Sequence, residues 1–394
     1  MLINNKRALA YIQVVHNIEP IVGADNIEKV HVLGWDLIAK KGEFKENDHC
    51  VYIEIDSKVS PNISAFSFLA SKGYKIKTYN LKKFNVISQG IALPVTLFPK
   101  LVKLPVNTDV TEELGITYSV AEDNDRKEDL SNIGKKGKLR KFIAKHNKFF
   151  NGKFGKFLVG HKITNCFISF IACATYKSCN ISVCFPSFVV KTDEERVQNM
   201  PSILTNKSKF IVTEKIDGTS STYALERNKN NTFKFYVCSR NRNVTAEKET
   251  SAGGVYWAMA KKYEIEKYLT KYLQENPTVN HVVLQGESFG VALQDNPLRQ
   301  ATQDLRIFNL IDDVNGRYGS VEGSKIVESW GMKWVPIIST DYVLPDTVDE
   351  LILAATGPSQ INKDVLREGW VIRSLDGKIS FKAVSTKYLL LKNK

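Results

Sequence analysis

The sequence has 394 residues, of which 43% are hydrophobic, 25% charged and 10% aromatic. This length allows two or three domains with buried cores, and the composition excludes a fibrous or wholly disordered protein. The first ten residues include Lys6 and Arg7 but no apolar segment of the signal-peptide kind. We therefore expect an intracellular protein, cytoplasmic or nuclear, that is not secreted. The formal net charge of +13 is concentrated in one block, which indicates a polyanionic partner.

Residues 8–98 read as short strands separated by turn residues, and Ala65–Lys72 has a helical pattern. This spacing predicts a small antiparallel β-barrel, of the kind called OB-like, over residues 1–120. Such barrels bind oligonucleotides by stacking aromatics and by placing cations against phosphates. Candidate contacts are Trp35, Tyr52, Tyr74, Lys75, Lys77 and Lys82. The alternative, favoured for any single aromatic, is a place in the core.

Residues 121–184 break this pattern with charge, glycine and asparagine, which indicates a basic linker or insertion of unknown role. Between Arg126 and Lys162, twelve Lys or Arg stand against two acids, favouring nucleic-acid contact over a solvated tether. Four cysteines follow within nineteen residues but form no C-x-x-C pair, so neither zinc nor a disulfide framework is favoured. The nearly uncharged stretch Ile163–Val190 is too polar to cross a membrane, and no membrane association is expected.

Regular periodicity returns over residues 185–394. Thr192 followed by Glu195 predicts a capped helix over Asp193–Asn199, and a second helix is predicted over Val255–Glu275. The predicted strands are Phe210–Lys215, Thr222–Glu226, Thr232–Cys238, His281–Gly286, Leu305–Ile311, Trp370–Ser374 and Lys378–Val384, the last two joined at Asp376-Gly377. We therefore predict an α+β protein whose C-terminal domain contains mostly antiparallel strands.

The segment from Glu214 to Gly218 suggests chemistry. Here an apolar strand runs into Lys215, carboxylates lie on both sides, and Gly218 permits a tight turn. A lysine attacks only as the free amine, so neighbours have to lower its pKa. K-x-D-G alone is common, and the alternative is a surface lysine in an ion pair.

Further chemically competent residues follow in order along the chain. Arg240 ends the next long strand and could bind phosphate, Glu287 ends a buried strand, and Phe308 could stack on a base. A carboxylate and a lysine then come from the two strands of the last hairpin, at Glu368 and Lys382. Their order favours a catalytic role for Lys215, which an isolated K-x-D-G would not.

In this order the motifs resemble those of the covalent nucleotidyltransferase superfamily of ligases and capping enzymes. The matching stretches are Lys215–Gly218, Ser239–Asn241, Gln285–Glu287, Arg306–Phe308, Glu368–Ile372 and Phe381–Lys382. The variant is similar to ATP-dependent RNA ligases of the Deinococcus/Naegleria type, which carry an N-terminal OB module. Two segments support the narrower resemblance, Phe185–Asn199 and the N-terminal stretches that include Tyr52–Asp56. The resemblance implies an ATP-grasp-like nucleotidyltransferase (adenylyltransferase) domain over residues 185–394.

The resemblance also implies a three-step reaction. Lys215 attacks ATP to give lysyl-AMP, AMP moves to a 5′-phosphate, and a 3′-hydroxyl displaces AMP. Residues expected to bind the nucleotide or its phosphates are Glu214, Lys215, Gly218, Arg240, Glu287, Phe308, Lys382 and Arg196. Lys382 is expected at the α-phosphate and Glu214 at the adenine amino group. The carboxylates of Asp217, Glu287 and Glu368 are expected to hold Mg²⁺, with Mn²⁺ as an alternative, largely through water.

Several points stay open at this stage. Val384 stands where the last motif has its second lysine, and Lys387 is a candidate substitute. A DNA ligase or capping guanylyltransferase is disfavoured because the OB-like module precedes the core and about a dozen residues follow Lys382. A non-catalytic RNA-binding protein is a further alternative. We expect a monomeric enzyme that acts on RNA ends, either in nicked duplex RNA or in RNA–DNA hybrids, as in RNA repair.

Overall fold

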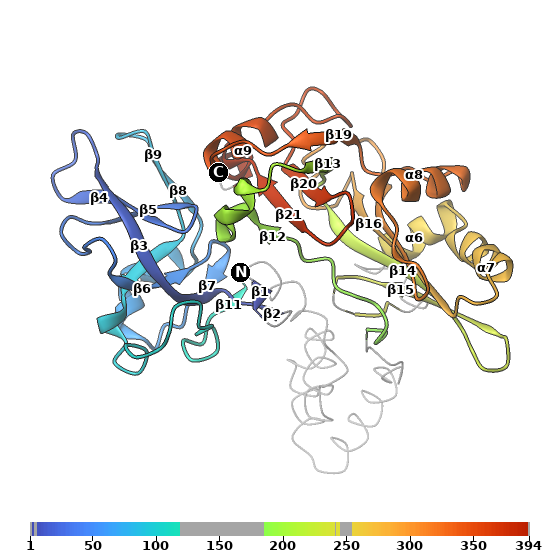
Figure 1. Ribbon diagram of the computed structural model, residues 1–394, viewed down its shortest axis with the longest axis horizontal. Coiled ribbons are helices and arrows are strands. Elements are labelled where there is room, and N and C mark those ends of the chain that lie inside the picture. Colours follow the sequence, from blue (N-terminus) through green and yellow to red (C-terminus); the bar gives the residue numbers. More distant parts are fainter. Residues whose placement is uncertain (1, 4–5, 119–184, 241, 245–253, 393–394) are drawn as a thin grey trace, which may run out of the picture. The chain divides into compact units, whose positions relative to one another are not determined.

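The computed structural model describes residues 2–3, 6–118, 185–240, 242–244 and 254–392 (Figure 1). The basic block that starts at Arg126 and the cysteines from Cys166 to Cys184 lie outside these residues. Residues 1–118 and 183–394 belong to one compact unit. In the described part of the chain, no helix is long and apolar enough to cross a membrane.

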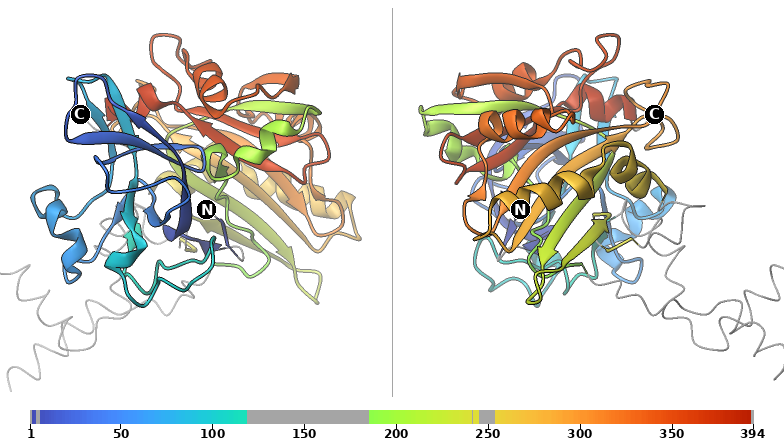
Figure 2. Two further views of the ribbon diagram at one scale, coloured as in Figure 1. Left: turned by 60° about the vertical axis from the view of Figure 1, so that its left-hand side comes forward. Right: turned by 90° about the vertical axis from the view of Figure 1, so that its right-hand side faces the viewer.

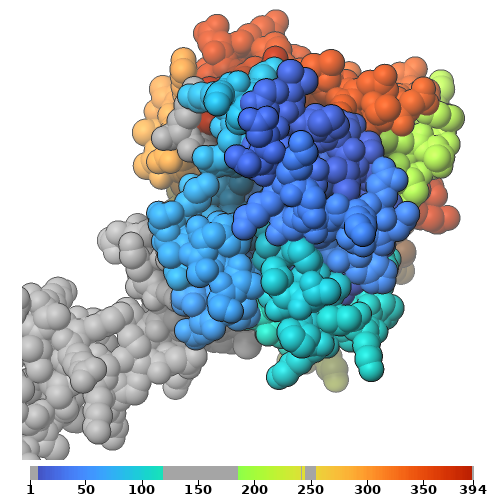
Figure 3. All heavy atoms as spheres, turned by 90° about the vertical axis from the view of Figure 1, so that its left-hand side faces the viewer, coloured from blue at the N-terminus to red at the C-terminus, as the bar shows by residue number. Residues whose placement is uncertain are grey.

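The N-terminal module is built on a five-stranded antiparallel sheet with strand order β10-β6-β3-β4-β5. These strands are β3 (Ala10–Pro20), β4 (Ile27–Val32), β5 (Trp35–Lys40), β6 (His49–Ile53) and β10 (Ile91–Pro94). Smaller elements complete it: β1 (Leu2–Ile3), β2 (Lys6–Arg7), β7 (Ser57–Lys58), η1 (Ser64–Lys72), β8 (Thr78–Leu81), β9 (Val86–Gln89), η2 (Val95–Leu97) and β11 (Thr117–Tyr118). Figure 3 shows one face of this module, where blue and cyan residues form a continuous surface. The predicted OB-like sheet and the helical turn after residue 64 are confirmed.

Aromatic side chains fill the interior of this module. Trp35, Tyr52 and Tyr11 are fully buried. The rings of Trp35 and Tyr52 stack with centroids 5.9 Å apart, and Tyr11 meets Tyr52 edge-on at 5.4 Å. Trp35 and Tyr52 therefore belong to the core, which was the favoured alternative, and they offer no surface for base stacking.

The C-terminal domain contains two five-stranded sheets. The first has the order β12-β21-β20-β13-β19, and every neighbouring pair is antiparallel except β12 with β21. Its strands are β12 (Glu195–Arg196), β13 (Lys209–Lys215), β19 (Ile337–Val343), β20 (Gly369–Ser374) and β21 (Ser380–Val384). Helix α9 (Val348–Ala355), with a capping box at Thr347 and Glu350, contributes to the apolar core on one face of this sheet.

The second sheet has the order β15-β14-β16-β17-β18. Its strands are β14 (Thr219–Arg227), β15 (Phe233–Cys238), β16 (His281–Phe289), β17 (Asp304–Asp312) and β18 (Gly316–Arg317). Helices α6 (Gly254–Lys262), α7 (Ile265–Glu275) and α8 (Ser320–Ser329) pack on one face, as the right-hand view of Figure 2 shows. The predicted α+β class with antiparallel strands is confirmed.

Two predicted helices differ from the structure. Instead of a helix over Asp193–Asn199, the chain forms β12 and the 3-10 turns η3 (Val197–Asn199) and η4 (Pro201–Thr205). Parallel pairing of Arg196 with Lys382 explains this change, because a partner distant in sequence overrides the local capping signal. The helix predicted over Val255–Glu275 is two helices, since Glu264 adopts a left-handed conformation with φ of 45° between them.

Candidate active site

Lys215 occupies the last position of β13, a strand that is hydrogen-bonded on both sides, to β20 and to β19. The chain then leaves the first sheet and enters the second as β14 within four residues. Ile216 anchors this crossing in the core with 5% of its surface exposed. A Cβ on Gly218 would lie 2.3 Å from the carbonyl oxygen of Ser288. The turn therefore requires glycine, as the sequence indicated.

Strand pairing places Lys215 and Lys382 on the same face of the first sheet. Thr213 lies opposite Val371, and Val371 lies opposite Lys382. Side chains alternate along a strand, so Lys215 projects on the same face as Thr213. The other face carries the apolar core, to which Phe210, Val212, Ile372 and Phe381 belong. The two lysines are thus held on a polar face by a packed sheet.

Three carboxylates surround the end of β13. The Nζ atom of Lys215 lies 2.7 Å from Oε2 of Glu368, the residue just before β20. Glu287 projects from β16, and its Cγ lies 3.1 Å from where a Cβ on Gly218 would be. Asp217 is part of the turn itself, and its side chain is 11% exposed. Residues predicted from separate motifs therefore meet at Lys215.

The electrostatics of this cluster favour extra positive charge. Burial raises the pKa of Glu287 to about 8, and the charges of Glu368 and Asp217 add to the rise despite the opposing effect of Lys215. Burial alone would lower the pKa of Lys215, but Glu368 and Glu287 outweigh it and hold that pKa above its usual value. A cation near the carboxylates would offset their negative charge, lower the pKa of Lys215 and so favour the free amine.

The donor set fits a hard divalent ion held through water. Carboxylate oxygens are the ligands that Mg²⁺ accepts, and Mg²⁺ usually keeps several of its waters. Among the described residues, no three His, Cys, Asp or Glu side chains lie close enough to enclose a metal ion directly. Outer-sphere contact from Asp217, Glu287 and Glu368 is consistent with both observations, and the raised pKa of Glu287 marks the uncompensated charge that such an ion would offset.

Two of the predicted phosphate-binding residues, Arg240 and Arg196, make defined contacts in the structure. Arg240 lies 2.5 Å from Asp193 and 5.6 Å above the ring of Tyr118. Arg196 is 7% exposed and lies 3.6 Å from Asp56 of the N-terminal module. Its Nε and Nη1 atoms are buried and have no hydrogen-bond partner within the described residues. A buried guanidinium with unused donors is suited to an anionic ligand.

The residues expected to contact the base lie on different strands. Glu214 is 2% exposed and accepts hydrogen bonds from the Ser359 hydroxyl at 2.5 Å and from the Gln360 backbone at 2.7 Å. Burial raises its pKa although both hydrogen bonds oppose the rise. Phe308 is the extra residue of a bulge in β17, where Gly286 pairs with Ile307 while its neighbour pairs with Asn309. Ser359 and Gln360 had no sequence signal, because they meet Glu214 only in the fold.

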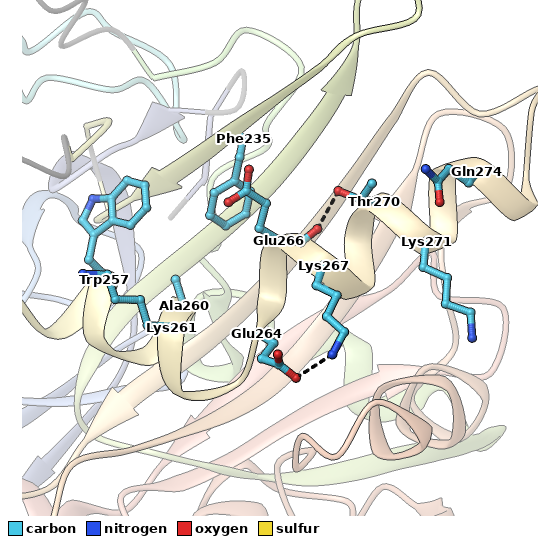
Figure 4. A pocket seen from close by; sticks show the side chains of 10 residues that line it. All are labelled: Phe235, Trp257, Ala260, Lys261, Glu264, Glu266, Lys267, Thr270, Lys271 and Gln274. Atoms are coloured by element: carbon cyan, nitrogen blue, oxygen red, sulfur yellow. Dashed lines mark hydrogen bonds and ion pairs between the residues drawn. The ribbon is translucent and has the colours of Figure 1, made fainter.

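Other residues near the site were also missed. Arg373 of β20 contacts Glu194 at 2.9 Å and donates to the carbonyl oxygen of Phe308 at 3.0 Å, which ties the two sheets together. Tyr388 and Lys392, from helix α10 (Thr386–Lys392), both contact Asp217. A separate open hollow of about 750 Å³ lies along α6 and α7 (Figure 4) and is lined by none of the predicted site residues. One of its lysines is neutralised by a neighbouring glutamate, Lys267 by Glu264 at 2.9 Å.

Two mostly antiparallel sheets that meet at a strand-end lysine, with carboxylates and a second lysine beside it, are the arrangement of the covalent nucleotidyltransferase class. A family model described as RNA ligase matches residues 208–389, and an OB-fold domain model matches residues 9–95. The chain belongs to the RNA ligase family, because it is also 32% identical over 98% of its length to a solved RNA ligase. Among curated protein sequences none matches this chain.

Solved structures of an RNA ligase from Naegleria gruberi resemble nearly the whole chain. The structure of that ligase with PPi is 32% identical, with a TM-score of 0.74, and the match covers 99% of this chain and 100% of that chain. A mutant of the same ligase with ATP and Mn is also 32% identical, with a TM-score of 0.73 and coverage of 97% and 98%. A mutant with AMP and Mn is 32% identical, with a TM-score of 0.73 and coverage of 98% and 99%.

Proposed function

We propose that this ATP-dependent RNA ligase seals a 3′-hydroxyl to a 5′-phosphate in nicked duplex RNA or in RNA–DNA hybrids, with Lys215 as its nucleophile. The observation that carries the assignment is the position of Lys215, 2.7 Å from Glu368 and on the same sheet face as Lys382. Nζ of Lys215 attacks the α-phosphorus of ATP, and the bond to the pyrophosphate oxygen breaks. A 5′-phosphate oxygen then displaces Lys215 from AMP, and a 3′-hydroxyl finally displaces AMP.

Lys215 has to lose a proton before it attacks. Glu368 already accepts a hydrogen bond from the ammonium group and is the nearest base. Its pKa is raised by burial, although Lys215 opposes the rise. A divalent ion beside Asp217, Glu287 and Glu368 would supply positive charge that favours the free amine and balances charge on the phosphates.

Cations on the polar face would stabilise the phosphates during transfer. Negative charge grows on the α-phosphoryl oxygens, and Lys382 lies two residues along β21 from the position opposite Lys215. Arg196 lies beside Lys382 in the register of β12 and β21. Two of its donors have no partner among the described residues, and a phosphate oxygen of ATP would satisfy them. Arg240 would exchange its contact with Asp193 for a phosphate.

The nucleotide base is expected beside β13 and β17. Phe308 projects from a bulge, which can turn a side chain toward a ligand. Glu214 accepts two hydrogen bonds from Ser359 and Gln360 and is held in one orientation. A carboxylate in this position would accept from the amino group of adenine, whereas guanine presents a carbonyl oxygen there.

We assign RNA binding to the OB module within residues 1–120 and leave residues 121–184 as an insertion between it and the adenylyltransferase domain over 185–394. The segment Ser57–Thr108 contains eight lysines and no acidic residue. Lys72, Lys82 and Lys83 are exposed, and Lys72 lies 3.8 Å from the ring centroid of the exposed Tyr79. We call these three lysines the lysine surface. A cationic surface with one exposed aromatic fits an RNA backbone and is consistent with a monomeric enzyme that grips duplex beside a nick.

Adduct formation with α-labelled ATP and α-labelled GTP tests the first step. We expect wild type to retain label from ATP and to lose it on addition of pyrophosphate, while Lys215→Ala retains none. A stronger GTP adduct would favour a capping enzyme, and an undiminished adduct in Lys215→Ala would remove the assignment of the nucleophile.

A matched panel of nicked RNA, RNA–DNA hybrid and DNA substrates tests the later steps. Each nick carries the same sequence, a 5′-phosphate and a 3′-hydroxyl, with ATP and Mg²⁺ in excess. Sealing of RNA or hybrid nicks at least tenfold faster than DNA nicks supports the proposal. Faster sealing of loose single strands than of any nick would overturn the preference for duplex.

A further inference from the structure

Two side chains of α10 contact a single oxygen atom of Asp217. The Tyr388 hydroxyl donates to Oδ2 at 2.6 Å, and Nζ of Lys392 lies 2.5 Å from the same atom. Positions four apart share one face of a helix, so α10 presents both groups to the turn that follows Lys215. Neither contact engages Oδ1 of Asp217.

Helix α10 also packs against the N-terminal module. Leu389, adjacent to Tyr388, forms a buried cluster with Val384 and with Ile55 of that module. Ile55 is 1% exposed and Leu389 is 8% exposed. Strand β8 of the module also contacts α10. The helix therefore connects the proposed RNA-binding module to a carboxylate beside the nucleophile.

We propose that Tyr388 is a positioning residue for Asp217 and that Lys392 is a built-in cation that a divalent ion displaces from this carboxylate. The inference rests on the proposed metal role of Asp217, and it assigns to α10 a control over metal loading. Packing of Ile55 against Leu389 keeps the helix in place for both contacts.

The two contacts have opposite consequences for a divalent ion. The tyrosine donates from a neutral hydroxyl, so it fixes the carboxylate without removing its charge. The lysine carries a full charge and competes with a divalent ion for the same carboxylate. The side chain of Lys392 is 45% exposed and that of Asp217 only 11%, so the lysine can withdraw into solvent while the carboxylate stays in place.

Substitution of each residue should therefore change metal affinity in opposite directions. Loss of the orienting hydroxyl in Tyr388→Phe should weaken Mn²⁺ binding about tenfold, as for other partners that orient metal-binding carboxylates. Loss of the competing charge in Lys392→Met should strengthen Mn²⁺ binding about fivefold. Lys378→Met, which removes an 83% exposed lysine in the β20–β21 turn, is the matched charge control and should leave affinity unchanged.

The experiment measures free Mn²⁺ by electron paramagnetic resonance during titration of the full-length protein without ATP. The same proteins are then assayed for the Mn²⁺ concentration that gives half-maximal Lys215 adenylylation. Opposite shifts in Tyr388→Phe and Lys392→Met, with no shift in Lys378→Met, support the proposal. Equal affinity in all four proteins, or weaker binding in both α10 variants, overturns it.

Ile55→Ala tests the connection to the N-terminal module, because Ile55 belongs to that module and packs against Leu389 of α10. We expect Mn²⁺ binding to weaken about threefold while circular dichroism stays as in wild type; an unchanged affinity overturns this part. Failure of the proposed function is distinguishable, since wild type would then form no AMP adduct at any Mn²⁺ concentration. Failure of the present inference leaves the wild-type adduct intact and only removes the difference between variants.

Discussion

The indole N–H of Trp35 donates a hydrogen bond of 2.7 Å to the side-chain oxygen of Asn199, 164 positions later in the chain. The same oxygen accepts from the Tyr11 hydroxyl at 2.9 Å. The amide nitrogen of Asn199 donates to Glu54 at 2.7 Å and to Glu195 at 2.5 Å. Asn199 is 4% exposed, so one amide joins the core of the N-terminal module to the segment that carries Arg196.

Asn199→Ala should lower the free energy of unfolding by about 2–4 kcal/mol, because several buried polar groups lose a partner at once. Asn199→Asp should be at least as destabilising, since its carboxylate would face Glu54 and Glu195. Urea unfolding followed by tryptophan fluorescence measures both variants. Asn62→Ala, at an exposed position of the same module, is the control and should stay within about 0.5 kcal/mol of wild type.

His31 gives the N-terminal module a pH-dependent stability. The hydrogen bond to Asp36, 2.8 Å from Nδ1, raises the pKa of His31 above its usual value, although burial opposes the rise. Nε2 lies 3.3 Å from Glu19, which also pairs with Lys29 at 2.7 Å. Because the folded-state pKa is raised, the contribution of His31 to stability is fully present below about pH 6.5. It is lost as pH rises through the raised value.

Between pH 6 and pH 8.5 the free energy of unfolding of wild type should therefore fall by about 0.5–1 kcal/mol relative to that of His31→Gln. Urea unfolding of both proteins at the two pH values measures the difference. A constant gap between wild type and variant across this range would show that His31 does not change its charge in the folded protein.

Sequence patterns predicted the parts of the fold that depend on local chemistry. Short runs rich in apolar residues predicted β13, β16 and β17, and Asp376-Gly377 predicted the last hairpin. The helix predicted over Asp193–Asn199 was wrong because β12 pairs with β21, nearly two hundred residues away. No local pattern could indicate that pairing, which the fold alone creates.

The same division applies to the candidate site. Motif order indicated Lys215, Glu287 and Glu368. Lys215 is the last residue of β13, Glu287 lies within β16 and Glu368 directly precedes β20, so the strands fix their positions. The contact of Lys392 with Asp217 joins positions 175 apart, and the spacing of residues in α10 does not predict it. The sequence singled out Lys387, an exposed residue five positions before Lys392, only as a substitute for the second lysine of the last motif.

Gly218→Ala should reduce the rate of Lys215 adenylylation about a hundredfold, because displacement of a reacting group by about 1 Å has an effect of this size. An added Cβ would lie 2.3 Å from the Ser288 carbonyl oxygen and 3.1 Å from Glu287. The turn that holds Asp217 would have to shift away from β16. Single-turnover formation of labelled enzyme–AMP measures the rate.

The matched control for this change is Gly319→Ala. Its added Cβ meets no atom within 4 Å, and the backbone φ of −60° suits any residue. We expect wild-type adenylylation in this control. A similar rate in Gly218→Ala would mean that the turn has more freedom than the close contact with Ser288 allows.

The lysine surface provides a test of RNA binding that leaves the nucleotide site untouched. Serine in place of Lys72, Lys82 and Lys83 should weaken binding of a nicked RNA duplex and preserve adenylylation, because these side chains are exposed and make neither of the α10 contacts with Asp217. The control variant replaces Lys40, Lys41 and Lys45, three exposed lysines in a segment that also carries Glu43, Glu46 and Asp48.

Each lost phosphate contact should reduce the slope of log affinity against log salt by about one. Titrations at several salt concentrations should therefore give a slope shallower by about three in the first variant and close to wild type in the control. Equal slopes in both variants would place the RNA on another part of the protein.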